Sequence, residues 1–181
     1  MSKIENRKEH FMELYIPVRR QISNYCRTLT RNEYLAGDLL QDTLLSAFEG
    51  MEYIRKKESF LFYLCATAKR IYLKQKRRNK YVVDSEEMVE NETISSEKEA
   101  MTNIDIQILY KAIDQLPEKQ REVIVLFEII GFSIKEIKAI QGGSMSGVKS
   151  RIVRAREKLT SLMSDSEIEE QKIGNQKIEK I

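Results

Sequence analysis

Residues 116–162, LPEKQREVIVLFEIIGFSIKEIKAIQGGSMSGVKSRIVRAREKLTSL, decide the fold of this chain. Their order of helix starts and stops predicts three successive helices. Pro117 suits the first turn of a helix, where its missing N–H costs nothing, and Gly131 ends that helix. Ser133 and Glu136 have the capping-box spacing that begins a second, short helix, which the next pair of glycines ends.

The third helix of this stretch, which Ser144 can cap, combines an apolar stripe with basic faces. The apolar residues recur at steps of three and four and are Val148, Ile152, Ala155, Leu159 and Leu162. The basic residues on the other faces are Lys149, Arg151, Arg154, Arg156 and Lys158. A short helix, a glycine turn and a basic amphipathic helix are typical of a helix-turn-helix, whose last helix enters the DNA major groove.

Three stretches of the N-terminal half also keep the helical spacing of apolar residues, over residues 8–30, 34–48 and 59–79. In the first, Pro17 must either open a second helical piece or kink a single helix. Residues 50–59 are rich in charge and are expected to form a loop. The third stretch begins apolar and ends basic, so one helix is predicted to run from a core to a surface that faces a polyanion.

The net charge of the 181 residues is only +3, but the charges are segregated along the chain. Residues 69–80 contain seven Lys and Arg and no acid, whereas residues 84–99 contain seven Asp and Glu and one Lys. A near-neutral total therefore hides a locally basic surface that suits a polyanion.

The acidic residues 83–101 contain few apolar side chains and show no clear period, which is typical of a flexible linker. The sequence therefore predicts an all-α chain of two small helical domains, residues 8–82 and 102–163, joined by this linker. The scarcity of proline and glycine agrees with that class. A polar tail, residues 164–181, is expected to be disordered.

Several segments resemble one known family, the bacterial RNA polymerase sigma factors. LPEKQREV (116–123), SIKEI (133–137), GVKSR (147–151) and RAREKL (154–159) are similar to the C-terminal promoter-binding domain of that family. DLLQDTLLSAF (38–48) is similar to the most recognisable part of its region 2. The closest group is the small, two-domain extracytoplasmic-function type.

The resemblance implies that the helix containing residues 38–48 docks on the clamp helices of the largest polymerase subunit. Asp38, Gln41 and Asp42 lie at i, i+3 and i+4 and therefore share one helix face. A polar, acid-tipped face suits a partner that presents Arg and apolar side chains. The predicted polymerase-binding residues are Asp38, Leu39, Gln41 and Asp42.

The resemblance also implies that the basic segment behind this helix melts and holds the minus-10 promoter element. An opened strand needs cations along its phosphates and aromatic faces for its bases. Phe60 and Tyr63 share the apolar stripe and are expected in the core instead. The predicted minus-10 contacts are Arg55, Lys56, Lys57, Lys69, Arg70, Lys74, Arg77 and Arg78. Arg70 stands where the family usually has Asn.

The helix-turn-helix is implied to read the minus-35 element, while its domain binds the flap of the second-largest subunit. Arg151 is the first choice for a guanine edge, and Lys149 and Arg156 are expected to hold phosphates. Gly143 departs from the family pattern, which has an apolar residue there. The predicted minus-35 contacts are Ser144, Ser146, Lys149, Ser150, Arg151, Arg154 and Arg156.

The implied function is a dissociable sigma factor that binds core RNA polymerase, directs it to promoters and helps melt the minus-10 element, without catalysis of its own. An anti-sigma factor is a further implied partner. His10, Cys26 and Cys65 lack the spacing of a metal site, so neither metal nor cofactor is expected, and both cysteines are predicted in the core. With no apolar run long enough for a membrane, a cytoplasmic protein is expected.

Other functions remain open from the residues alone. A stand-alone regulator could bind DNA as a dimer through the same helix-turn-helix, with the N-terminal half as a sensor. A helical adaptor could bind RNA or protein through residues 69–80. An enzyme is the least favoured, because no paired carboxylates, nucleophile elbow or phosphate loop is present. Whether DNA recognition requires core polymerase separates the sigma-factor interpretation from the stand-alone regulator.

Overall fold

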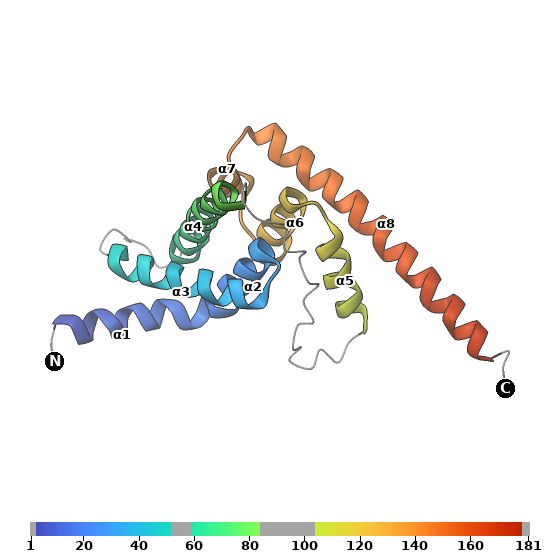
Figure 1. Ribbon diagram of the computed structural model, residues 1–181, viewed down its shortest axis with the longest axis horizontal. Helices are drawn as coiled ribbons and strands as arrows, with labels where there is room; N and C mark the ends of the chain where they lie inside the picture. The colour runs from blue at the N-terminus through green and yellow to red at the C-terminus, as the bar shows by residue number, and fades with distance from the viewer. Residues whose placement is uncertain (1–2, 52–58, 84–103, 179–181) are drawn as a thin grey trace.

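The computed structural model describes residues 3–51, 59–83 and 104–178, and these residues form helices and turns with no strand among them (Figure 1). The predicted all-α class is therefore confirmed for this part of the chain. The expected linker and most of the expected loop at residues 50–59 lie outside the described residues. Arg55, Lys56 and Lys57 lie outside them too.

The described part of the N-terminal domain contains four α-helices, with a short 3-10 turn between the first two. They are α1 (Lys3–Tyr15), η1 (Ile16–Val18), α2 (Arg19–Thr30), α3 (Glu33–Gly50) and α4 (Phe60–Val83). Pro17 lies in η1 and divides the first predicted stretch into two helices, which was one of the two expected outcomes. Asn32 caps α3, because its side-chain oxygen accepts a hydrogen bond from the Leu35 amide at 3.0 Å.

The core of the N-terminal domain is built from the apolar stripes of its helices. The ring of Phe11 makes edge-on contacts with Phe48 and Phe60, at centroid distances of 5.4 and 5.5 Å. Phe60 is only 1% exposed, which confirms that it is a core residue, and Tyr63 is half-buried beside it. Edge-to-face rings contribute about 0.5–1.5 kcal/mol beyond the area that they bury.

The C-terminal domain contains the predicted helix-turn-helix. Its elements are α5 (Ile104–Gln115), α6 (Glu118–Ile124), the π-helical turn η4 (Val125–Ile129), α7 (Ile134–Gln141) and α8 (Met145–Ile178). The predicted capping box is complete, since the Glu136 amide donates to Ser133 Oγ and the Ser133 amide donates to the Glu136 carboxylate at 2.8 Å.

The turn between α7 and α8 explains why Gly143 departs from the family pattern. Gly142 and Gly143 have φ values of +77° and +90°, which residues with a Cβ rarely adopt. Ser144 then caps α8, as predicted, because its Oγ accepts a hydrogen bond from the Gly147 amide at 3.0 Å. At position 143 the chain therefore has a tight turn in place of the apolar side chain of the family pattern.

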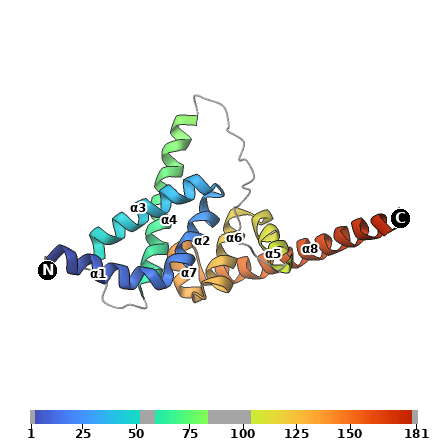
Figure 2. The ribbon, with the colours of Figure 1, turned by 90° about the horizontal axis from the view of Figure 1, so that it is seen from below.

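The prediction for residues 164–181 is wrong for residues 164–178, because α8 continues through Ile178. In Figures 1 and 2 this end of α8 projects beyond the other helices. No proline interrupts the segment, and Glu, Gln, Lys and Ile are all compatible with helix. Its polarity was read as disorder, although polarity alone does not oppose the continuation of an established helix.

The two domains pack against each other through α2, α4, α6 and α7. The buried apolar residues of both form one continuous cluster. Phe62 of α4 meets Phe132, which precedes α7, with ring centroids 5.9 Å apart and planes inclined by 67°. This contact brings the basic helix of the N-terminal domain beside the helix-turn-helix.

Two glycines provide a matched test of the backbone argument. Gly143→Ala should destabilise the protein by about 1–2 kcal/mol, because a Cβ disfavours positive φ although nothing crowds the site. Gly37→Ala should stabilise it by about 0.5–1 kcal/mol, because Gly37 is helical and an added Cβ has no neighbour within 4 Å. Urea unfolding of both variants checks this, and shifts of the same sign would refute it.

Burial also determines the chemistry of the two cysteines. Cys26 and Cys65 are free thiols in the core of the N-terminal domain, as predicted. Burial raises the pKa of Cys26 to about 12. Burial, with smaller contributions from Cys26 and Glu122, also raises the pKa of Cys65. Since the thiolate is the reactive form, both groups are inert at neutral pH.

The native protein should therefore resist thiol reagents at mildly alkaline pH. We expect Ellman's reagent to modify Cys26 and Cys65 only at the rate at which the domain opens, and to modify both rapidly in denaturant. Colour release recorded with and without urea measures this difference. Rapid stoichiometric modification of the native protein would show that at least one thiol is accessible.

Candidate nucleic-acid interface

The helix-turn-helix presents most of the predicted minus-35 residues together on the first turns of α8. Val148, Ile152 and Ala155 are buried against the domain, so the opposite side of the helix faces solvent. The predicted contacts exposed around that side are Ser144, Ser146, Lys149, Ser150, Arg154 and Arg156. A helix surface of hydroxyls and cations matches the donors and acceptors of base edges and phosphates.

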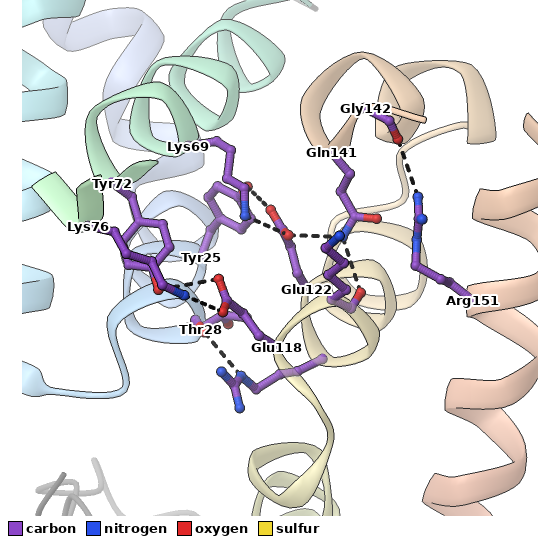
Figure 3. A network of polar contacts seen from close by, with 12 residues as sticks. Tyr25, Thr28, Lys69, Tyr72, Lys76, Glu118, Glu122, Gln141, Gly142 and Arg151 are labelled. Atoms are coloured by element: carbon purple, nitrogen blue, oxygen red, sulfur yellow. Dashed lines mark hydrogen bonds and ion pairs between the residues drawn. The ribbon is translucent and has the colours of Figure 1, made fainter. Parts of the chain in front are cut away.

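Two arginines of this set already have partners within the domain. Arg151 is half-buried and folds back over the glycine turn, where its guanidinium donates to the Gly142 carbonyl at 3.4 Å (Figure 3). Arg156 pairs with Glu128 of η4 at 2.6 Å, and its guanidinium lies 5.5 Å from the centroid of the Phe127 ring. Arg151 must leave a weak hydrogen bond before it can reach a base.

The sequence analysis did not single out two apolar residues on this helix. Met145 and Val153 are 40% and 52% exposed on α8, among the predicted contacts. Val153 is an apolar residue that lies outside the buried stripe of steps of three and four, and this off-stripe position is the sequence signal for its exposure. Exposed methyl groups on a recognition helix suit the methyl group of thymine.

The predicted polymerase-binding face of α3 is only partly as expected. Asp38, Gln41 and Asp42 are exposed, and the Asp42 carboxylate accepts a hydrogen bond from the Gln75 amide of α4 at 3.1 Å. Leu39, however, is 1% exposed and belongs to the core. Its assignment to the binding face is therefore wrong, since Leu39 lies about 100° around the helix from Asp38.

An open apolar groove of about 360 Å³ lies beside that polar face. Leu45, which lines this groove, is 58% exposed. The residues that line the groove are Phe11, Gly37, Leu40, Gln41, Leu44, Leu45 and Phe48. The combination of acidic side chains and an apolar groove fits a partner helix that presents both Arg and apolar residues.

The basic helix α4 divides its cations between two faces. Arg70, Lys74, Arg77 and Arg78 are exposed to solvent. Lys69 is only 8% exposed, and Lys76 shares its side of the helix because seven residues are almost two full turns. One predicted minus-10 contact, Lys69, therefore faces the C-terminal domain in this structure.

Glu122 of α6 is the centre of the contact between the domains (Figure 3). Its carboxylate is buried and accepts hydrogen bonds from Tyr25 Oη at 2.7 Å, Lys69 Nζ at 2.8 Å and Gln141 Nε2 at 3.0 Å. Burial and the neighbouring Glu122 raise the pKa of Tyr25, so its hydroxyl stays protonated and donates. A buried charge requires such partners, because desolvation would otherwise exclude it.

One turn earlier on α6, Glu118 makes a second link to α4. Its carboxylate accepts hydrogen bonds from Lys76 Nζ at 2.6 Å and Tyr72 Oη at 3.3 Å. Burial acts to raise the pKa of Glu118, but the hydrogen bond and charge of Lys76 outweigh it and lower the pKa. The hydrogen bond to Glu118 raises the pKa of Lys76. Both groups are therefore charged at neutral pH.

Arg121 joins the domains through the backbone. Its Nε donates to the Thr28 carbonyl of α2 at 3.1 Å, and its Nη1 donates to the Leu116 carbonyl at 3.2 Å. Arg121 is only 3% exposed, and burial lowers its pKa. Glu118, Arg121 and Glu122 lie in the segment LPEKQREV (116–123), whose pattern predicts a helix start and a family resemblance but no contact between domains.

Among the residues that the structure describes, no three His, Cys, Asp or Glu side chains gather in a group that could hold a metal ion. None of the described helices is long and apolar enough to cross a membrane. The candidate functional residues lie on three separate surfaces, which are the exposed face of α8, the acidic face of α3 and the basic helix α4.

Comparison with known proteins assigns both halves of the chain. Residues 14–81 match the family model for Sigma-70 region 2, and residues 106–159 match the model for Sigma-70, region 4. The two matches cover the same segments that carry the acidic face of α3, the basic helix and the helix-turn-helix.

Individual relatives agree with this assignment. The ECF RNA polymerase sigma-E factor of Salmonella typhimurium is 33% identical over 132 residues, which are 66% of this chain and 69% of that protein. The ECF RNA polymerase sigma factor EcfG of Rhodopseudomonas palustris is 28% identical over 136 residues, 75% of each chain. The sigma factor RpoE of Bartonella quintana, solved in complex with the anti-sigma factor NepR, superposes with a TM-score of 0.77 at 26% identity, over 86% of this chain and 98% of that chain. The chain therefore belongs to the extracytoplasmic-function sigma factors, which direct RNA polymerase to specific promoters to begin transcription.

Proposed function

We propose a division of this work between the two domains. Residues 8–82 bind core polymerase and the minus-10 strand, residues 102–163 bind the minus-35 element, and residues 83–101 tether them. The family matches at 14–81 and 106–159 support the division, since each lies inside one proposed domain. The chain supplies promoter specificity and leaves catalysis to the polymerase. Its place of action is the cytoplasm, where bacterial transcription occurs.

The proposed polymerase contact is the exposed side of α3. Asp38, Gln41 and Asp42 supply acceptors for Arg side chains of the clamp helices, and Leu45 with its groove supplies apolar surface. This combination is the observation that carries the proposal. A free-standing repressor has no use for an acidic docking face on the domain that also contains its basic helix. The flap is proposed to bind the outer surface of the C-terminal domain.

The proposed minus-10 contact uses the exposed face of α4. Arg70, Lys74, Arg77 and Arg78 recur within one sector of the helix, so they can follow the phosphates of an opened strand. Lys69 can join them only after it leaves Glu122. Arg55, Lys56 and Lys57 remain proposed contacts on the sequence resemblance alone.

The proposed minus-35 contact is the solvent side of α8. Ser144, Ser146 and Ser150 donate or accept at base edges or phosphates, Lys149, Arg154 and Arg156 supply charge, and Val153 adds methyl groups. Arg151 is assigned to a guanine edge, because its bond to the Gly142 carbonyl is long enough to be exchanged at little cost.

We also propose that an anti-sigma factor controls this chain. The Bartonella quintana relative is solved in complex with the anti-sigma factor NepR, and the match covers 98% of that sigma factor. The groove beside α3 offers such a protein an apolar surface that overlaps the proposed polymerase contact. Binding there would exclude the polymerase by competition.

The direct test of function is run-off transcription from a library of promoter fragments with core polymerase. We expect specific initiation only when this chain is added, with sequence selection at both promoter elements. A gel shift with the chain alone is the control and should show weak binding, because two weak modules gain strength when the polymerase fixes their spacing. Tight specific binding by the chain alone, without initiation, would favour the stand-alone regulator.

Substitution of two exposed cations of α8 separates the effect of a direct DNA contact from the effect of net charge. Arg154→Ala should reduce run-off product by about tenfold, which corresponds to about 1.4 kcal/mol, because it removes a direct contact with the promoter. Lys158→Ala removes the same charge one turn further along and should change the product less than about twofold. Equal losses in the two variants would show that Arg154 acts only through net charge.

A further inference from the structure

Two lysines of α4 and two glutamates of α6 form two ion pairs between the domains. Lys69 and Lys76 lie seven residues apart on one side of α4, and Glu122 and Glu118 lie four residues apart on α6. The two ion pairs measure 2.8 Å and 2.6 Å between nitrogen and oxygen. Each lysine therefore donates to a carboxylate of the other domain through N–H groups that could equally donate to a phosphate.

Tyr72 lies between these two lysines on the same side of α4. Lys69 Nζ is 5.5 Å and Lys76 Nζ is 5.7 Å from the centroid of its ring. Its hydroxyl donates to Glu118, so the ring is also held in the domain contact. An aromatic face flanked by two cations is the arrangement that binds single-stranded nucleic acid, with a base stacked on the ring and phosphates on the cations.

The ion pairs between the domains add little net stability, so another anion can replace the carboxylates. Lys69 and Glu122 lose their hydration when the domains pack, so the attraction between them is largely offset by desolvation. The pair of Lys76 and Glu118 is half-exposed and adds little net stability. Separation of the domains returns all four charges to water, where the lysines are available to another anion.

We propose that α6 is an internal phosphate mimic, whose Glu118 and Glu122 occupy Lys69 and Lys76 and cover Tyr72 until the domains separate. These three residues of α4 then form a further contact for the single strand of the promoter, beside the cations that stay exposed. The inference rests on the proposed minus-10 role of α4. It adds Tyr72 and Lys76 to that role and explains why Lys69 is buried in the closed form.

The first arm of the test measures closure. Dyes placed through Glu13→Cys in α1 and Ser161→Cys in α8 report energy transfer between the domains, and the native thiols do not compete because they are buried. Glu122→Gln should lower the transfer efficiency, because it leaves the Lys69 charge buried without a partner unless the domains open. Unchanged transfer in this variant and in the next would overturn the proposal.

A second variant guards against misfolding at the buried site. Glu118→Lys places two like charges together and should also lower the transfer, whereas Glu118→Lys combined with Lys76→Glu restores an ion pair and should recover it. Glu128→Lys is the matched control, because it makes the same charge change and breaks an ion pair that lies within the C-terminal domain. Loss of transfer in the control equal to that in Glu118→Lys would count against the proposal.

The second arm measures binding of a fluorescent, mixed-sequence single-stranded oligonucleotide to the full chain. Glu122→Gln should bind about tenfold more tightly than the wild type at low salt, and two added phosphate contacts should steepen the salt dependence by about 1.4 in log–log slope. In that background Lys76→Ala should remove about 0.7 of the slope. Open variants with unchanged affinity and slope would refute the masking of these lysines.

The outcomes distinguish this inference from the proposed function. Promoter-specific run-off by the wild type with core polymerase establishes the proposed function whether or not the free domains are closed. Failure of run-off would reject the proposed function even if the variants open and bind the oligonucleotide. Opening of the variants together with the expected gain in binding is the result that supports the phosphate mimic.

Discussion

The buried carboxylate of Glu122 is the constraint on which the arrangement of this molecule depends. It accepts hydrogen bonds from Tyr25 of α2, Lys69 of α4 and Gln141 of α7, so three helices from both domains converge on one charge. Such a charge is tolerated in a core only when donors surround it. The apolar contact of Phe62 with Phe132 adds attraction but little direction. The carboxylate fixes how the domains meet.

The fold was largely predictable, because its signals are local. Pro17 broke the first helical stretch, and the pair of Ser133 and Glu136 began α7, since each acts on backbone within one turn of itself. The role of Glu122 was not predictable, because Lys69 is 53 residues away and belongs to the other domain. The prediction for Leu39 was wrong because Leu39 is next to Asp38 in the motif but lies about 100° around the helix from it, in the core.

The sequence predicted the residue types of the site, but it did not predict which of these side chains are exposed to bind nucleic acid. The cations of α4 were identified from composition, yet composition cannot show which side of the helix a second domain covers. The structure divides them into an exposed set and a paired set, with Lys69 and Lys76 in the latter. A protein that must bind a polyanion only in one assembly can use its own carboxylates to occupy part of the surface. Exchange of these ion pairs for a phosphate costs little net free energy, because the attraction within each pair is largely offset by desolvation.

The closed contact also reaches the helix that reads DNA. Gln141, the last residue of α7, donates a hydrogen bond to Glu122. The carbonyl of the next residue, Gly142, accepts a hydrogen bond from the guanidinium of Arg151. Gly142 and Gly143 of the turn that follows have φ values of +77° and +90°, which glycine adopts more readily than residues with a Cβ. Gln141 Nε2 also donates to the Lys119 carbonyl of α6 at 3.2 Å, so two hydrogen bonds hold the end of α7 to α6. The carboxylate that joins the domains and the side chain assigned to the guanine edge are therefore hydrogen-bonded to two adjacent residues, Gln141 and Gly142, at the end of α7.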